Sequence, residues 1–432
     1  MTDIYEIAEY TLKALKNCGA DAAQCIVGRS KKDELNVDGG KFSLMRSTFN
    51  TSISMKAIKD GKKGVTSINQ ATKEAIDEAA TQCIAAAESS VTDEAEQIAP
   101  FTAKVEYKTG VFEPDLNKLF DRIEEFMSQT KKEYPKVILE QLISDYEHSE
   151  KLYMNTNGTS LRYEHGEYSF NTMFSAHEGE KASSFNGYFC ALDNLDKPFM
   201  DAGMQRQLLE ESEKQLNTVS PSEKFVGKVI YSPDCFNELL QTALENFASS
   251  GVLIDGTSPW KDALNTKVAS EKLNLRSVPL DGRTVVGQRF TSDGYPAENM
   301  DIIVDGVLKT FILSQYGANK TGFPRALNGG NNLEVLPGDK TLEEMISGID
   351  RGLIVNRFSG GQPSSNGDFS GVAKNSFLIE DGKVSSAVSE TMISGNIIDM
   401  LNNIVAISKE QTTDGLSFMP WAEFDGVTVS GK

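Results

Sequence analysis

Residues 357–383 read RFSGGQPSSNGDFSGVAKNSFLIEDGK, a run in which glycines and turn residues separate short segments that alternate apolar with polar side chains. The run continues into NSFLIEDGKVSSAVSE (375–390), two alternating segments around Asp381-Gly382. Asp-Gly between such segments is a strong signal for a β-hairpin. A second hairpin is predicted around Asp305-Gly306 in ENMDIIVDGVLKTFILS (298–314). We therefore expect the second half of the chain to consist mainly of antiparallel strands with a few helices.

One helix is clearly signalled ahead of these strands, in SPDCFNELLQTALENF (232–247). Ser232 is a good N-cap, Pro233 suits the first helical position, and Gly251 follows the end. Apolar residues recur at helical spacing and form one stripe. They are Phe236, Leu239, Leu240, Ala243, Leu244 and Phe247.

The first half mixes helical and alternating segments, and so predicts an α+β fold. Helices are expected from Thr2, a candidate cap, to Asn17, and over 71–89, 116–134 and 203–219. Strands are expected around Asp60-Gly61, and an antiparallel meander over 137–194. We predict an N-terminal α+β domain, 1–220, with a sub-boundary near the polar stretch 97–114, and a C-terminal β-rich domain, 221–432.

The charge balance argues against a nucleic-acid partner. Lys and Arg number 43 against 62 Asp and Glu, so the formal charge of −19 repels a phosphate backbone. The N-terminus, MTDIYEIAEYTLKALKN, is not a secretory signal, and no run of ~18 uncharged apolar residues follows it. We expect a cytoplasmic protein with no membrane partner.

Cysteine and histidine, the usual ligands of zinc, are scarce and scattered. Five cysteines without CxxC spacing predict small buried side chains rather than a disulfide framework. The histidines are His148, His165 and His177. A zinc peptidase helix would need a second His four residues after His177, where Lys181 stands, so a solvated turn is the favoured interpretation of His177-Glu178.

The glycine-rich stretch 357–383 is the best candidate for a binding segment. Gly360 and Gly361, followed by Gln362, leave main-chain groups accessible, so the segment is predicted to line a cleft and to hydrogen-bond an extended peptide. Ordinary turn chemistry between strands explains the glycines equally well. Asp368 is a candidate general base, although a lone carboxylate in such a loop is more often a turn or cap residue. The sequence contains no G-x-S-x-G elbow, no P-loop and no G-x-G-x-x-G after a strand.

Several motifs, in order, resemble the TldD/PmbA family, whose members were once labelled modulators of DNA gyrase. The main match is GGQPSSNGDFSGVAKNSFLIEDGKVSSAVSETMISGNIIDMLNNIVAIS, residues 360–408. Others are SPDCFNELLQTAL (232–244), DGYPAENMDIIVDGVLKTFILSQYGANKTG (293–322) and FDGVTVSGK (424–432). The resemblance covers most of the chain, most strongly from Phe225 onward.

The resemblance also assigns the chain to one branch of that family. TldD-like members resemble zinc peptidases that carry HExxxH on the helix corresponding to 232–247. Here Gln241 and Thr242 stand where His and Glu would be, and Asn246 stands where the second His would be. Amides are poor zinc ligands, and a threonine hydroxyl cannot act as the general base. The catalytic branch also supplies a Cys near its C-terminus, whereas the last cysteine here is Cys235.

The resemblance thus implies a TldE/PmbA-like chain with no catalytic residue and no cofactor of its own. Its expected partner is a TldD-like subunit that carries the zinc, and the substrates are expected to be unfolded or small peptides. Two other functions stay open at this stage. One is a standalone peptide-binding or regulatory protein, for instance a homodimer, and the other is an independent hydrolase that binds a metal through His177.

Overall fold

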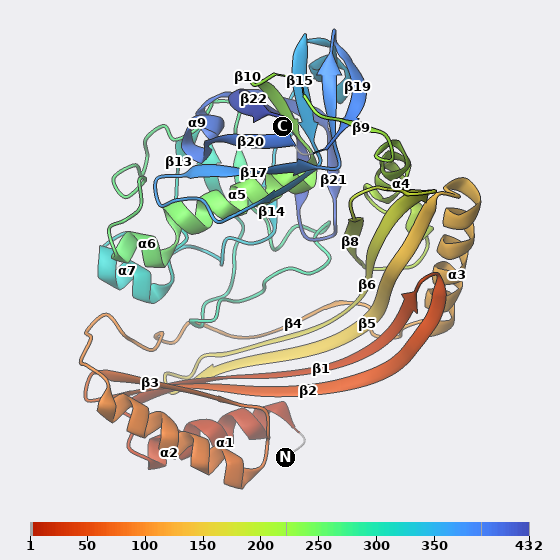
Figure 1. Ribbon diagram of the computed structural model, residues 1–432. Helices are drawn as coiled ribbons and strands as arrows, with labels where there is room; N and C mark the ends of the chain where they lie inside the picture. The colour runs from red at the N-terminus through yellow and green to blue at the C-terminus, as the bar shows by residue number, and fades with distance from the viewer. Residues whose placement is uncertain (1–2, 222, 390, 432) are drawn as a thin grey trace.

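The computed structural model describes residues 3–221, 223–389 and 391–431 and has two large mixed sheets with helices around them (Figure 1). The predicted α+β class, with a second half dominated by antiparallel strands, is confirmed. The first sheet has the order β3-β2-β1-β5-β6-β4, with β7 and β8 paired to β6. Its strands are β1 (Ala22–Asp38), β2 (Lys41–Lys59), β3 (Lys62–Ile68), β4 (Lys104–Gly110), β5 (Val137–Asn155), β6 (Ser160–Glu178), β7 (Lys181–Ala182) and β8 (Asn186–Leu192).

Helices cover the outer face of this curved sheet, while its concave face is turned toward the C-terminal half (Figure 1). They are α1 (Ile4–Asn17), α2 (Lys73–Ser89) and α3 (Leu116–Glu133). The carboxylate of Asp3 caps α1 by accepting from the N–H groups of Tyr5 and Glu6 at 2.9 and 3.0 Å. Thr2, the cap expected from the sequence, lies outside the described residues.

The polar stretch 97–114 contains a strand that the sequence did not reveal. β4 pairs in parallel with β6 along its whole length, from Lys104 opposite Ser160 to Gly110 opposite Gly166. Only one face of this edge strand packs on the protein, so it carries few apolar residues. The segment is therefore part of the first sheet, and the domain boundaries remain predictions from sequence.

Connecting elements lead from the first sheet into the second. They are the 3-10 helix η1 (Phe199–Asp201), α4 (Gln205–Lys214) and β9 (Thr218–Val219).

The second sheet has the order β13-β12-β11-β14-β22-β10-β15-β18-β19-β9, with β16, β17, β20 and β21 as side branches. Its strands are β10 (Phe225–Tyr231), β11 (Leu275–Ser277), β12 (Met300–Val304), β13 (Val307–Leu308), β14 (Leu333–Val335), β15 (Arg351–Val355), β16 (Arg357–Gly360), β17 (Asp368–Lys374), β18 (Ser376–Glu380), β19 (Lys383–Val388), β20 (Thr391–Asn396), β21 (Ile404–Thr413) and β22 (Phe418–Ser430).

The helices of this half are α5 (Pro233–Ala248), α6 (Ser250–Ile254), α7 (Gln315–Thr321), α8 (Leu342–Ser347) and α9 (Ile397–Asn402). Asp-Gly pairs form the tight turns of the β2–β3, β12–β13 and β18–β19 hairpins, as predicted. Both residues of each pair have positive φ, for example 49° at Asp381 and 73° at Gly382. That conformation matches the twist of the flanking strands, and aspartate and glycine tolerate it.

The two halves share buried contacts. One core cluster joins Phe170 and Leu208 of the first half to Ile230 and Trp421 of the second. A smaller cluster joins Tyr153 and Leu161 on the concave sheet face to Phe290, which precedes β12. Because both contacts are apolar and buried, they fix the halves relative to each other. Among the described residues, no helix has the length and apolar character needed to cross a bilayer.

Candidate functional site

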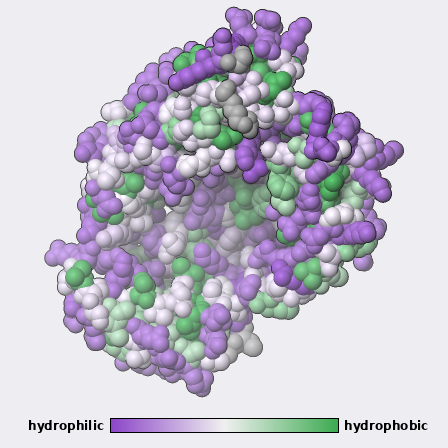
Figure 2. Space-filling model, in the orientation of Figure 1, coloured by the Kyte–Doolittle hydropathy of each residue, from purple (hydrophilic) through white to green (hydrophobic). Residues whose placement is uncertain are grey.

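Helix α5 stands between the two sheets with one face in the core and the other beside open cavities (Figures 1 and 2). The hydroxyl oxygen of Ser232 caps the helix by accepting from the N–H of Cys235 at 3.4 Å, and Pro233 is its first residue. The predicted apolar stripe is buried. Asn237 and Gln241, one turn apart, lie on the opposite face. The amphipathic pattern therefore turns amide side chains toward the hollow between the two halves.

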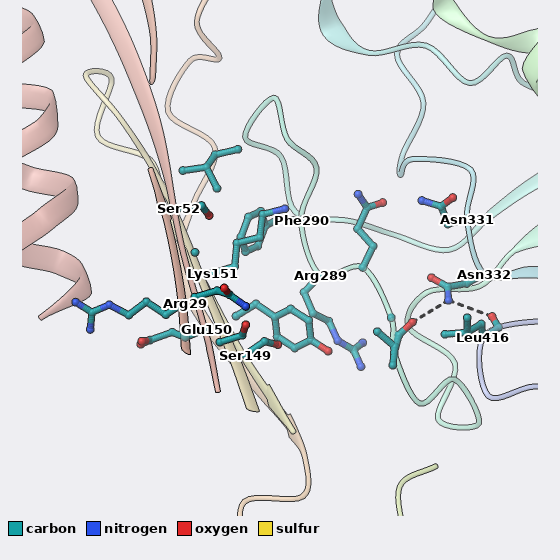
Figure 3. A pocket seen from close by; sticks show the side chains of 18 of the residues that line it. Arg29, Ser52, Ser149, Glu150, Lys151, Arg289, Phe290, Asn331, Asn332 and Leu416 are labelled. Atoms are coloured by element: carbon teal, nitrogen blue, oxygen red, sulfur yellow. Dashed lines mark hydrogen bonds between the residues drawn. The ribbon is translucent and has the colours of Figure 1, made fainter. Parts of the chain in front are cut away.

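A cavity of about 680 Å³ separates α5 from the concave face of the first sheet (Figure 3). One wall consists of β1, β2, β5 and β6 and includes Ser52 and Lys151. Segment 286–290 and Asn332 form the opposite wall, where the Asn332 amide donates to the carbonyls of Val286 and Leu416 at 2.9 and 3.0 Å. The volume is typical of a site for a ligand of moderate size.

A second cavity, of about 590 Å³, borders the same helix and is acidic. Asp234, Glu238 and Asp414 line it together with Arg357. Asp234 is exposed to the cavity but otherwise enclosed by protein. Desolvation, and then the charges of Asp414 and Glu238, raises its pKa to about 6. Desolvation also raises the pKa of Glu238, against the opposing charge of Arg357.

A third cavity, of about 270 Å³, lies between α5 and the β16–β17 hairpin. It brings three of the predicted peptide-binding residues, Gly360, Gly361 and Gln362, beside Thr242 of α5. β16 pairs only with β17 within the described part of the chain, and its residues Phe358, Ser359 and Gly360 line the cavity. An edge strand beside a cavity offers main-chain groups to an extended ligand.

The glycines of this segment have different roles. At Gly360 a Cβ atom would lie 2.5 Å from the Phe358 ring, so the ring can occupy this position because residue 360 has no side chain. Gly361 has open space around it. Gly367, with φ of +94°, is the member of this group that needs the left-handed conformation. Backbone conformation therefore accounts for Gly367, but not for Gly360 or Gly361.

Asp368 does not join the predicted peptide-binding residues. It is exposed at the start of β17, and its carboxylate accepts from the amides of Asn396 and Asn366, both at 2.9 Å. The hydrogen bonds from Asn396 and then Asn366 hold the pKa of Asp368 below its usual value, which weakens it as a base. The contacts are those of a turn residue, the alternative given by the sequence.

The positions expected to correspond to HExxxH divide between the cavities and the helix surface. Gln241 lines the 680 and 590 Å³ cavities, and its amide donates to Asn237 at 3.4 Å. Thr242 faces the 270 Å³ cavity. Asn246 instead donates back to the main-chain carbonyl of Thr242 at 2.9 Å. Amides and a hydroxyl in these contacts do not suit a zinc ion.

Each of the three histidines lies close to another polar side chain. His148 Nε2 lies 3.1 Å from Glu164, His165 Nε2 lies 3.1 Å from Glu167, and His177 Nε2 lies 2.9 Å from Ser175. Within residues 3–221, 223–389 and 391–431, no three His, Cys, Asp or Glu side chains are grouped so that they could hold a metal ion.

The sequence did not identify the charged residues of the cavities. Lys151 and Arg289 line the 680 Å³ cavity, Asp234 and Glu238 line the acidic one, and Asp414 lines both. The partial signal was the helical spacing of Asp234, Glu238 and Gln241 on the polar side of α5. Lys151 in a strand and Arg289 in a loop had no local signature.

Comparison with protein families gives matches at both ends of the chain. Residues 224–431 match the model described as PmbA/TldA metallopeptidase C-terminal domain, and residues 23–87 match PmbA/TldA metallopeptidase domain 1. A metalloprotease of Methanocaldococcus jannaschii is 27% identical over 212 residues, 45% of this chain and 46% of that protein. Metalloprotease PmbA of Escherichia coli O157:H7 is 30% identical over 155 residues, 35% of this chain and 34% of that protein. The chain spans about half the length of the archaeal relatives that it matches.

Solved structures share the fold along the whole chain. TldE from Thermococcus kodakarensis has a TM-score of 0.86 at 23% identity, covering 98% of this chain and 100% of that chain. A Bacteroides thetaiotaomicron protein described as a modulator of DNA gyrase has a TM-score of 0.83 at 23% identity, with full coverage of both chains. At such identities the likeness establishes the fold alone.

Proposed function

Because the chain belongs to the PmbA/TldD family of metallopeptidases, we propose that it is the TldE/PmbA-like, non-catalytic subunit of a heteromeric zinc peptidase. In this proposal a TldD-like partner carries the zinc, and the pair acts on unfolded or small peptides in the cytoplasm. The present chain completes the chamber in which the peptide lies and holds part of its main chain.

The polar face of α5 is the observation that carries this proposal. Gln241 and Thr242 line the cavities at positions where the family resemblance expects a metal ligand and a general base. A helix with amides in place of ligands still has the shape to line a peptide chamber. It lacks the groups that bind zinc and deprotonate a metal-bound water.

The edge of β16 supports a role in holding peptide. A peptide added beside an edge strand gains main-chain hydrogen bonds that do not depend on its sequence. The neighbouring cavity of about 270 Å³ is lined by Phe358, Phe369 and Leu239 and has room for an apolar side chain. Such a combination suits a subunit that handles varied peptides.

Reconstitution with a TldD-like protein tests the proposal. The two chains should copurify, and cleavage of an unfolded peptide should need both. Gln241→Ala in this chain should leave cleavage in place, while loss of the first histidine of HExxxH in the partner should abolish it. Cleavage by this chain alone would contradict the proposal.

The same experiment decides the alternative of a standalone peptide-binding or regulatory protein. That alternative predicts peptide binding and, for a homodimer, self-association with no effect of the TldD-like protein. Sizing of the chain with and without the partner separates the two outcomes.

A further inference from the structure

The charged residues that line the 680 Å³ cavity are Arg29, Glu150, Lys151, Arg289 and Asp414, in a chain whose formal charge is −19. Of the cations, Lys151 lies on β5 and Arg289 lies in the segment before β12 (Figure 3). No carboxylate of the described residues lies within 4.0 Å of the charged nitrogens of Lys151 or Arg289. By contrast, Arg162 on the outer face of the same sheet contacts Glu106, Glu150 and Glu164 at 2.6–3.2 Å.

Aromatic rings hold these two cations at the junction of the halves. Lys151 and Tyr163 are opposite each other in the β5–β6 register. The guanidinium of Arg289 lies 5.9 Å from the centre of the Tyr163 ring, and Lys151 Nζ lies 5.8 Å from the centre of the Phe290 ring. The ring faces attract the cations weakly and leave their charge without a counterion.

Lys151 is exposed and Arg289 is half-buried. Desolvation lowers the pKa of Lys151, and no neighbouring carboxylate opposes the effect. The Nε–H of Arg289 is buried without a hydrogen-bond partner among the described residues. An anion that entered the cavity would supply what both groups lack, and a carboxylate suits the planar guanidinium.

We propose that Lys151 and Arg289 form a carboxylate-binding site at the sheet end of the cavity, which takes the C-terminal carboxylate or an acidic side chain of a bound peptide. This inference rests on the peptide-binding role proposed above and adds a preference for one chemical group. The hydroxyls of Ser30, Ser52 and Ser149 line the same wall and are available as further donors. The site would orient the peptide along α5, because Gln241 lies between this cavity and the acidic one.

Matched peptides test the preference. The probes are short uncharged peptides with a free C-terminus, the same peptides with a C-terminal amide, and the amides with one internal Glu. Their kcat/KM is measured with the reconstituted pair, and their binding is measured with the full chain alone. The wild-type protein should favour a carboxylate-bearing probe over the neutral amide by about tenfold or more. Preference for the free acid alone assigns the C-terminus, and preference for the Glu-containing amide assigns a side chain.

The variants separate a specific site from general charge. Lys151→Gln and Arg289→Gln should each reduce the preference severalfold, and Lys151→Arg should preserve it. The control is the double variant Lys41→Gln, Arg351→Gln. It removes two positive charges that do not line the cavity, and it should leave the preference unchanged. Thermal unfolding verifies each variant, and if Arg289→Gln does not fold, Lys151→Gln decides.

The inference and the proposed function fail in different ways. If the pair cleaves the acid and amide probes equally well, the carboxylate site is wrong while the peptidase role stands. If the pair cleaves nothing, the peptidase role is wrong, and binding to the chain alone decides the site. The carboxylate site is then wrong if the chain binds all the probes equally or binds none of them.

Discussion

Carboxyl groups on the concave face of the first sheet lie close to one another. Glu167 on β6 is directly opposite Glu147 on β5, and Lys32 is the nearby cation, 3.0 Å from Glu147. Desolvation, and then the charges of Glu147 and Asp145, raises the pKa of Glu167 to about 7. Desolvation lowers the pKa of the adjacent His165. Near neutral pH, Glu167 therefore holds a proton part of the time beside a neutral imidazole.

Glu167→Gln should stabilise the protein at alkaline pH. Because the pKa of Glu167 is higher in the folded protein than its ordinary value of 4.5, its protonated form contributes to the stability of the fold. This contribution is complete below pH 4.5 and is lost as the pH rises through about 7. Glutamine does not ionise and avoids this loss. We expect a gain of roughly 1–3 kcal/mol in the free energy of unfolding at about pH 8 and little gain at about pH 4, measured by urea denaturation.

The control for this prediction is Glu150→Gln on the outer face of the same sheet. Glu150 lies 2.6 Å from Arg162, so its removal should give no gain at either pH. An equal loss of stability for Glu167→Gln at both pH values would show that its contact with His165 matters more than its charge.

The β16–β17 hairpin owes its shape to two glycines beside one aromatic ring. Gly360 and Gly371 are opposite each other, and a Cβ atom on either would meet the Phe358 ring at 2.5 or 2.4 Å. Gly360→Ala should displace the ring, lower the free energy of unfolding by roughly 1–3 kcal/mol and reshape the 270 Å³ cavity. Thermal unfolding and a crystal structure of the variant measure both effects.

Gly361→Ala is the matched control, one residue away. No atom lies within 4 Å of a Cβ at this position, so the change should alter stability by no more than about 0.5 kcal/mol. Equal effects of the two substitutions would mean that glycine is needed at position 360 for backbone freedom rather than to make room for the Phe358 ring.

Elements with strong local signals could be predicted from the sequence. The Asp-Gly hairpins and the capped, amphipathic α5 depend on residues a few positions apart, and the structure has them where the pattern indicates. β4 was missed because an edge strand buries one face only, and a parallel partner leaves no turn signal between the strands. Its pairing with β6 is a property of the sheet rather than of the segment.

The candidate site could be predicted only in part, because it forms where the two halves meet. The sequence indicated the polar side of α5 and the segment at Gly360, since each lies within one continuous motif. Lys151 and Arg289 come close only when the segment before β12 docks on the concave sheet through Phe290. No local pattern carries that information.

The shared core makes a prediction for the whole chain. Phe170 and Leu208 pack in one buried cluster with Ile230 and Trp421, so the boundary predicted at residue 220 cuts through apolar contacts. The full chain should unfold in a single calorimetric transition. A fragment of residues 1–220 should expose its share of the cluster, bind a hydrophobic dye and lose cooperative unfolding, and co-expression with 221–432 should restore the transition. Sharp unfolding of the fragment near the melting temperature of the full chain would instead show that the first sheet with its helices is an independent domain, and that the cluster joins two finished units.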